Sequence, residues 1–188
     1  MALETCLKHH FLLAMPRIDQ DASDYFANTI TYICEHNEDG AMGFMVNRPM
    51  QLTVAGLLEQ LGIPATVKPQ QPVLEGGPVK TERGFILHSD DVQYDASLAL
   101  GNGLMLSTAK QTLEAIGAGS GPQRFLVALG YAGWGSGQLE NELSKNVWLT
   151  CPADIEILFE VPFHERVNKA AASLGIDFRL MSTHAGHA

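Results

Sequence analysis

The sequence has few positive charges, and those it has are dispersed. Only 12 of its 188 residues are Lys or Arg, whereas 21 are Asp or Glu, so the net charge at pH 7 is −9. No two cations are adjacent in the chain. Because Lys and Arg residues that neutralise phosphates supply much of the affinity for nucleic acids, this composition disfavours direct nucleic-acid binding unless the fold gathers distant cations on one face.

Cysteine and long apolar runs are also scarce. The three cysteines, Cys6, Cys34 and Cys151, form no C-x-x-C pair, and their odd number argues against a secreted disulfide framework. The apolar run at 7–15 is interrupted by Lys8 and two histidines, so it lacks the pattern of a signal peptide. No run approaches the roughly 20 apolar residues that cross a bilayer. We therefore expect a cytoplasmic protein without a membrane segment.

The apolar periodicity predicts an α+β fold with a large mixed sheet. Strands are expected at 11–15, 30–34, 41–46, 124–129, 147–149 and 155–159. The segments 30–34 and 41–46 form a predicted hairpin whose loop is longer than two residues. Helices are expected at 53–61, 108–117 and 138–145, capped by Thr53, Thr108 and Ser136, and after Pro162. Strands outnumber helices without strict alternation, and no linker divides the chain, so we expect one domain.

The common catalytic and cofactor motifs are missing. There is no phosphate-binding P-loop, no G-x-G-x-x-G and no nucleophile elbow. A zinc-protease helix begins at His164 and Glu165 but has Asn168 where the second histidine belongs. Cys34 and Cys151 lie in apolar segments, which predicts buried, unreactive thiols. We expect no cofactor and no metal site, while a Ser-His-Asp triad assembled from distant segments stays open.

The glycine-rich run at 130–142 is the most informative stretch. Four glycines surround Trp134, and an acidic helix start follows, which predicts an open turn between a strand and a helix. Arg48 follows a predicted strand at a position where a guanidinium can bind a carboxylate or phosphate. The alternatives are a packing role for Trp134 and a salt bridge from Arg48. The predicted partners of that salt bridge are Glu75, Glu140 and Glu142. The residues expected to line a binding cleft are Asn47, Arg48, Gly76, Gly77, Trp134, Gln138 and Glu142.

Several motifs, taken in order, resemble the AlgH (YqgE-like) family of bacterial proteins. They are FLLAMP at 11–16, GAMG at 40–43 with NRP at 47–49, GGPV at 76–79, GFILH at 84–88, and GYAGW at 130–134 with GQL at 137–139. The resemblance implies a single cytosolic α+β domain with a bent, partly barrel-like mixed sheet flanked by helices. We expect this domain to span residues 1–182 and the polar segment 183–188 to be a mobile tail. The family name is linked to control of alginate production, and some members are described as transcriptional regulators. The resemblance supplies no catalytic residues.

Three hypotheses for function follow. The first is a non-enzymatic regulatory or interaction protein whose cleft receives a segment of an unknown protein partner, with any effect on transcription being indirect. The second is a small-ligand binder or a hydrolase-type enzyme, in which Arg48 holds an anionic group and His88 or Glu142 serves as the acid or base. The third is direct DNA binding, which the family label suggests and the charge disfavours.

Overall fold

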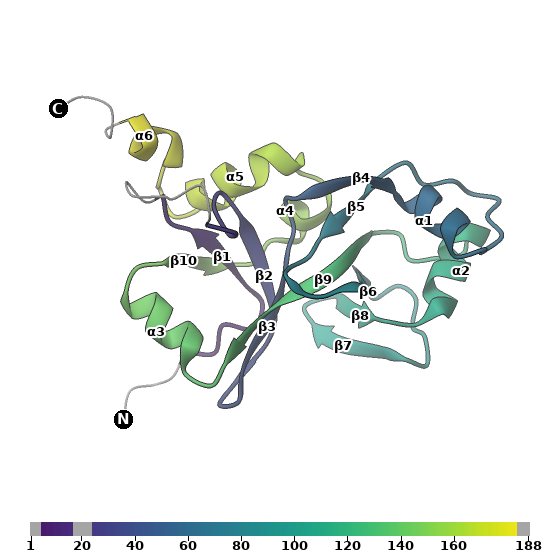
Figure 1. Cartoon of the computed structure of the whole chain (residues 1–188), viewed down its shortest axis with the longest axis horizontal. Coiled ribbons are helices and arrows are strands. Elements are labelled where there is room, and N and C mark those ends of the chain that lie inside the picture. The colour runs from purple at the N-terminus through teal and green to yellow at the C-terminus, as the bar shows by residue number, and fades with distance from the viewer. Residues whose placement is uncertain (1–4, 17–23, 184–188) are drawn as a thin grey trace. The chain divides into compact units, whose positions relative to one another are not determined.

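The computed structural model describes residues 5–16 and 24–183, and the chain divides into two compact units (Figure 1). Unit 1 comprises residues 1–47 and 132–188, and unit 2 comprises residues 48–131. Both units combine strands and helices, so the α+β prediction is confirmed. The single domain over 1–182 stays a prediction. The predicted tail lies outside the described residues, apart from Thr183.

Unit 1 contains five antiparallel strands in the order β10-β1-β2-β3-β9. They are β1 (His10–Ala14), β2 (Ile30–Asn37), β3 (Gly40–Met45), β10 (Trp148–Pro152) and the last residues, 132–135, of β9 (Phe125–Gly135). β1 and β2 fill the core of the unit because their side chains at Phe11, Leu12 and Ile33 are fully buried. The rings of Trp134 on β9 and Trp148 on β10 nevertheless have centroids only 6.0 Å apart. The two ends of the strand order therefore approach each other, so the sheet of unit 1 is curled.

The β2–β3 hairpin is confirmed, but the prediction of a long loop is wrong. Asn37 pairs with Gly40, so only Glu38 and Asp39 connect the strands. The Asn37 side chain accepts a hydrogen bond from the backbone N–H of Asp39 at 2.8 Å. Such short-range capping by Asn stabilises a tight turn. A register shift between Ile33 and Glu35 accommodates the extra residue within the strand instead.

The helices of unit 1 follow its last two strands. They are α3 (Gln138–Ser144), α4 (Ile155–Phe159), α5 (Arg166–Ala172) and α6 (Phe178–Thr183), with a 3-10 turn at Phe163–Glu165. The strand predicted at 155–159 is wrong, because this segment is α4. Asp154 caps it by accepting the backbone N–H of Glu156 at 2.8 Å. The cap and the acidic first turn outweigh the β-branched residues.

Unit 2 is a mixed sheet with two helices. Its strand order is β4-β5-β9-β6-β8-β7, in which β5 runs parallel to β9 and the other pairs are antiparallel. The strands are β4 (Pro49–Thr53), β5 (Pro72–Glu75), β6 (Val79–Ser89), β7 (Ser97–Gly101), β8 (Leu104–Ser107) and residues 125–131 of β9; the helices are α1 (Val54–Gln60) and α2 (Lys110–Ala118). Val54, Leu58, Ile86 and Val127 form the buried centre of this unit.

One of the helix caps predicted in unit 2 is confirmed and one is wrong. Thr53 caps α1, because its hydroxyl accepts the backbone N–H of Gly56 at 3.0 Å. The predicted capping box from Thr108 is absent: Ala109 is the N-cap of α2 and supplies no side-chain bond. The Ser107 hydroxyl instead accepts the Ala109 N–H at 3.2 Å and pairs with the buried hydroxyl of Thr112 at 2.7 Å. The first turn of α2 is therefore held by residues of the preceding strand.

The glycine-rich run is strand rather than turn as far as Gly135, which corrects the prediction. Gly130 has φ +75°, and a Cβ there would lie 2.4 Å from the carbonyl oxygen of Gly77. A Cβ at Gly76 would lie 2.3 Å from the Gly130 carbonyl oxygen. Unit 2 thus uses these glycines to bring two of its own backbone segments into contact. The predicted cap of α3 is also wrong, because Gly137 is the N-cap and the Ser136 hydroxyl donates to Glu38 O at 2.7 Å.

No helix in the described parts of the chain is long and apolar enough to span a membrane.

We expect Gly130→Ala to lower the free energy of unfolding by at least about 2 kcal/mol, because the new Cβ meets a carbonyl oxygen and requires a positive φ. Gly84→Ala is the matched control in the same unit. Its Cβ finds its nearest neighbour at 4.0 Å, so its effect should stay within about 1 kcal/mol. Urea unfolding followed by circular dichroism measures both, and equal midpoints would contradict the close-contact argument.

Candidate functional site

The carboxylate of Glu142 is the centre of the candidate site in unit 1. Its Oε2 atom accepts the indole N–H of Trp134 at 2.9 Å and that of Trp148 at 2.7 Å. Its Oε1 atom accepts the side-chain amide of Gln138 at 3.2 Å, one helical turn earlier on α3. Gln138 in turn accepts the backbone N–H of Gly135 at 3.0 Å. Three neutral donors thereby fix the position of one carboxylate.

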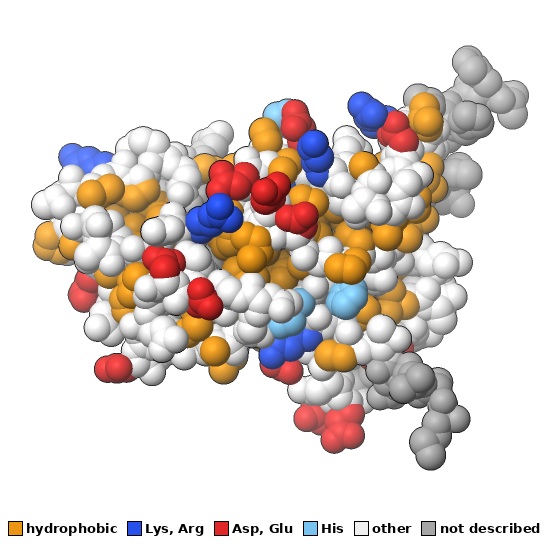
Figure 2. All heavy atoms as spheres, turned by 180° about the vertical axis from the view of Figure 1, so that it is seen from behind, with side chains coloured by type: hydrophobic (Ala, Val, Ile, Leu, Met, Phe, Trp, Pro, Cys, Tyr) orange, Lys and Arg blue, Asp and Glu red, His pale blue; other side chains and the backbone are white. Residues whose placement is uncertain are grey.

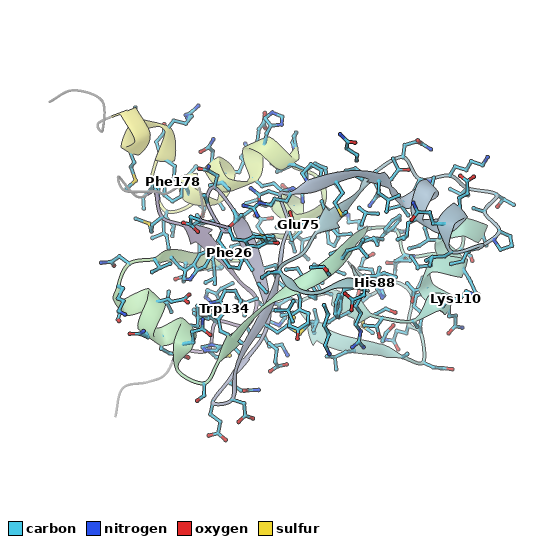
Figure 3. The ribbon with its side chains drawn as sticks, viewed as in Figure 1. Phe26, Glu75, His88, Lys110, Trp134 and Phe178 are labelled. Carbon is cyan, nitrogen blue, oxygen red and sulfur yellow. The ribbon has the colours of Figure 1, made fainter. Side chains whose placement is uncertain are left out.

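Aromatic rings surround these hydrogen bonds. Phe26 stacks on Trp134 with ring centroids 6.4 Å apart and meets the edge of Trp148 at 5.5 Å. Figure 3 labels Phe26 and Trp134, which come from segments far apart in the sequence. Both tryptophans are only 6% exposed, so Trp134 has the packing role that was the alternative to recognition. Trp134 nevertheless lines an open pocket, together with Phe26 and Trp148.

The pocket beside these rings has a volume of about 340 Å³. Its polar and aromatic lining consists of Asp24, Phe26, Trp134, Gln138, Glu142 and Trp148. Asp24 and Glu142 are its charged residues, and no Lys, Arg or His among the described residues lines it. Aromatic faces and carboxylates are the groups that favour a bound cation. The pocket therefore has the chemistry of a cation site.

Two lining residues with a clear role were missed by sequence reasoning. Trp148 donates the shorter of the two indole hydrogen bonds, and Phe26 contacts both indoles. The sequence predicts a strand at Trp148 and no site role, although the chain has just two tryptophans. That rarity was an available signal. Phe26 carried no signal, because nothing in its local sequence indicates that it packs against β9 and β10.

Asn47 lies elsewhere in unit 1. Its side-chain oxygen accepts the backbone N–H of Ile30 at 3.1 Å, and its amide donates to the Asn28 carbonyl at 2.9 Å. It borders a different pocket, together with Phe163 and Asn168. Its hydrogen bonds hold the segment before β2 against the residue that follows β3. The structure therefore brings Trp134, Gln138 and Glu142 together in one pocket and places Asn47 in another.

Arg48, Gly76 and Gly77 belong to unit 2. The Arg48 carbonyl accepts the backbone N–H of Glu75 at 2.9 Å. Glu75, one of the predicted salt-bridge partners, therefore lies beside Arg48 where β4 pairs with β5. The other two predicted partners of Arg48, Glu140 and Glu142, are engaged by His36 and by the indoles in unit 1. The seven-residue cleft combines residues of both units and stays a prediction.

A second pocket of unit 1, bordered by Cys6, His36, Ser136 and Glu140, has a histidine whose ring nitrogens are both occupied. The backbone N–H of Leu7 donates to His36 Nδ1 at 2.8 Å, so the proton of the neutral ring lies on Nε2. Nε2 donates to Glu140 at 2.6 Å. This hydrogen bond lowers the pKa of Glu140. His36 therefore has no free nitrogen with which to activate the thiol or the hydroxyl nearby.

His88, the alternative acid or base, is fully buried in unit 2. Its Nδ1 contacts the Ser89 carbonyl at 2.7 Å, and its Nε2 has no hydrogen-bond partner within the described part of the chain. Tyr94 packs against its ring at a centroid distance of 5.8 Å. A general acid or base must come within hydrogen-bond reach of its substrate. A side chain closed to solvent does not come within that reach, so the His88 version of the enzyme hypothesis is disfavoured.

Among the residues that the structure describes, no three His, Cys, Asp or Glu side chains are grouped as for a metal ion.

The thiols divide into one exposed and two buried groups. Burial raises the pKa of Cys34 to about 12 and also raises the pKa of Cys151. At pH 8 both buried groups are therefore protonated and shielded, and we expect Ellman's reagent to modify one thiol per native chain, Cys6, and three after unfolding in guanidinium. Cys6→Ser should abolish the fast reaction. A second fast thiol in the native protein would contradict the assigned burial.

We expect Glu142→Ala to lower the free energy of unfolding by about 2–4 kcal/mol, because two buried indole N–H groups lose their acceptor. Glu140→Ala is the control on the same helix. The Glu140 side chain is 43% exposed, so losing its contact with His36 should cost only about 0.2–1 kcal/mol. Urea titrations followed by circular dichroism give both values. Equal losses would show that the indole hydrogen bonds do not hold unit 1 together.

Comparisons with known proteins identify the family and the fold of this chain. A sequence model of the AlgH-like family matches residues 11–179. A UPF0301 protein of Stutzerimonas stutzeri is 54% identical over 186 residues, covering 97% of this chain and 96% of that protein. The UPF0301 protein AlgH of Pseudomonas aeruginosa PAO1 is 51% identical over 187 residues, covering 98% and 97%.

Two solved structures are similar. The solution structure of the AlgH protein from Pseudomonas aeruginosa has a TM-score of 0.80 at 50% identity and covers 100% of this chain and 99% of that one. A crystal structure of a Corynebacterium diphtheriae protein has a TM-score of 0.67 at 19% identity, covers 87% and 86%, and shows the shared fold alone. The resemblance read from the motifs is confirmed, and the chain belongs to the AlgH-like family.

Proposed function

We propose that this protein is a non-enzymatic cytoplasmic interaction protein whose unit 1 pocket receives a basic side chain of a protein partner. The observation that carries the proposal is the fixed carboxylate of Glu142. Its hydrogen-bond donors are two indoles and an amide, all neutral, so its negative charge is positioned but not cancelled. Among the described residues it makes no ion pair.

The surroundings of Glu142 favour a cation over an anion. Asp24 adds a second carboxylate to the pocket wall, and the rings of Phe26, Trp134 and Trp148 supply apolar surface beside the two carboxylates. A Lys or Arg side chain has an apolar stem for the rings and a charged end for the carboxylates. The net charge of −9 adds a long-range attraction that brings basic segments to the surface.

Direct DNA binding has less support. A pocket with two carboxylates repels phosphates, and on the face drawn in Figure 2 the Lys and Arg side chains lie apart from one another. The family link to alginate control and to transcription is therefore proposed to be indirect, through a bound protein. The enzyme alternative also loses support here, because the indoles occupy Oε2 of Glu142 and make this carboxylate a fixed anion.

Tryptophan fluorescence tests the pocket directly, because both tryptophans of the chain border it. The probes are a blocked tripeptide with a central lysine and the same peptide with glutamine. We expect the lysine peptide to change the emission in a saturable way and to bind more weakly at high salt, since salt screens the carboxylates. Equal responses to both peptides would contradict a cation site.

Gln138 offers a matched pair of variants. Gln138→Lys places a cation four residues before Glu142, and Gln138→Met removes the same hydrogen bonds without adding charge. We expect Gln138→Lys to weaken binding of the lysine peptide roughly tenfold relative to Gln138→Met, which corresponds to about 1.4 kcal/mol. Equal affinities of the two variants for the lysine peptide would show that binding does not depend on the charge of Glu142. Methylammonium binding as tightly as the peptide would favour the small-ligand alternative.

A further inference from the structure

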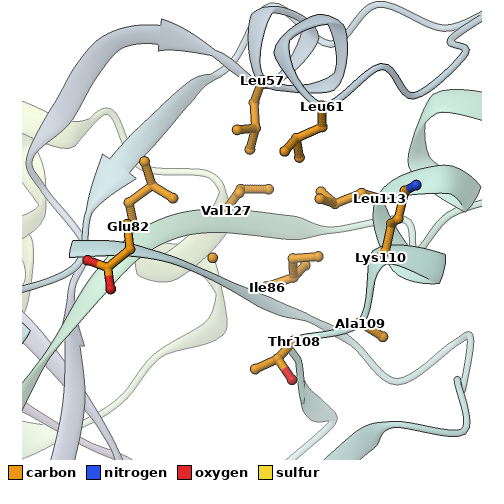
Figure 4. A pocket seen from close by; sticks show the side chains of 11 residues that line it. Leu57, Leu61, Glu82, Ile86, Thr108, Ala109, Lys110, Leu113 and Val127 are labelled. Atoms are coloured by element: carbon orange, nitrogen blue, oxygen red, sulfur yellow. The ribbon is translucent and has the colours of Figure 1, made fainter. Parts of the chain in front are cut away.

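Unit 2 has a pocket of its own, bounded by α1, α2 and the sheet (Figure 4). Its volume is about 390 Å³, within the range of about 300–1,000 Å³ that is typical of small-molecule sites. The walls and floor are aliphatic, with Leu57 and Leu61 from α1, Leu113 from α2, and Ile86 and Val127 from the sheet. Leu61 is 50% exposed at the mouth, so the apolar surface continues to solvent.

Polar groups are confined to the border of this pocket. Glu82 and Lys110 lie on opposite sides of the aliphatic side chains, and Thr108 lies apart from both, with Ala109 between it and Lys110 (Figure 4). The Lys110 ammonium has one ion-pair partner, Glu114, at 3.9 Å, and both side chains are more than half exposed. A long, exposed pair of this kind contributes little stability, so the ammonium can turn to another anion at little cost.

We propose that this pocket binds an acyl chain with a free carboxylate, the chain lying among the leucines and the carboxylate at Lys110. The apolar lining removes methylene groups from water, which favours binding in proportion to the area buried. The cation at one border selects the sign of the head group. The proposal concerns unit 2 alone and is independent of the partner site proposed in unit 1.

The charge distribution favours an anionic head group over a cationic one. The first turn of α2 begins at Lys110 and contains no acidic residue, so the helix dipole and the ammonium have the same sign there. Glu82 is the opposing charge, and it lies on an exposed strand segment between Thr81 and Arg83. A ligand carboxylate on the Lys110 side of the pocket lies away from Glu82, whereas a ligand cation on that side would be repelled by Lys110.

Gly84 gives a direct way to close the pocket. It borders the cavity on β6, and a Cβ built there finds its nearest neighbour, the Leu129 side chain, at 4.0 Å. Its φ does not lie in the left-handed region. Gly84→Leu therefore adds a side chain to the empty volume without backbone strain. Lys110→Gln removes the cation alone, and Lys68→Gln removes an exposed cation of the same unit that does not border the pocket.

The experiment is calorimetric titration of the full chain with sodium decanoate below its micelle concentration, because unit 2 contains no tryptophan. We expect saturable binding to the wild type, no detectable binding to Gly84→Leu, about three- to tenfold weaker binding to Lys110→Gln, and unchanged binding to Lys68→Gln. Melting temperatures without decanoate show whether each variant is folded. If Gly84→Leu is unfolded, the affinities of Lys110→Gln and Lys68→Gln for decanoate decide the test.

Three results with decanoate would overturn the proposal. They are no heat from decanoate with the wild type, equal affinity of wild type and a folded Gly84→Leu, or equal affinity of Lys110→Gln and Lys68→Gln. Decyltrimethylammonium tests the sign of the head group. If it binds as tightly as decanoate, the proposal is also overturned, because the head group would then lie at Glu82. None of these results depends on the lysine peptide, so this proposal and the one for unit 1 can fail separately.

Discussion

Two indole N–H groups that share one carboxylate oxygen form the contact on which unit 1 depends. Trp134 and Trp148 belong to β9 and β10, the two ends of the strand order, and Glu142 comes from the helix between them in sequence. The contact therefore joins sheet edges that no backbone ladder connects. Indoles donate but do not accept, so only an acceptor with two lone pairs available at one point can serve both rings.

The same contact gives the pocket its charge. Half-burying a carboxylate is unfavourable unless its hydrogen bonds are made, and here they are made by groups without charge. A lysine or arginine in the place of Gln138 or an indole would have satisfied the geometry and cancelled the charge. Unit 2 shows a different arrangement, an aliphatic cavity with Lys110 and Glu82 on opposite sides of its border. Under the two proposals, the pockets select ligands of opposite sign.

Sequence reasoning predicted the class of the fold, most strands and the helices α1, α2 and α3, because these follow from local periodicity and, for α1, from a good cap at Thr53. It failed where a local cap was overlooked and where tertiary contacts decide. The segment 155–159 has the composition of a strand, yet Asp154 caps it as a helix. The glycine-rich run at 130–142 predicted an open turn, yet Gly130 and Gly76 allow two backbone segments to touch. Trp134, Gln138 and Glu142 were predicted as site residues because they lie within the glycine-rich run and the helix start that follows it. Phe26 and Trp148 were not, because their role arises only when the sheet curls.

The division of the chain has a consequence for synthesis on the ribosome. Unit 2 is one continuous segment, 48–131, inserted between the two parts of unit 1. The first three strands of unit 1 emerge early, but β10, the partner of β1, and the C-terminal half of β9, the partner of β3, follow more than eighty residues later. The strands β1, β2 and β3 therefore have unpaired edges while the inserted unit is translated and folds. Their apolar residues are accessible to chaperones and prone to aggregation during that interval.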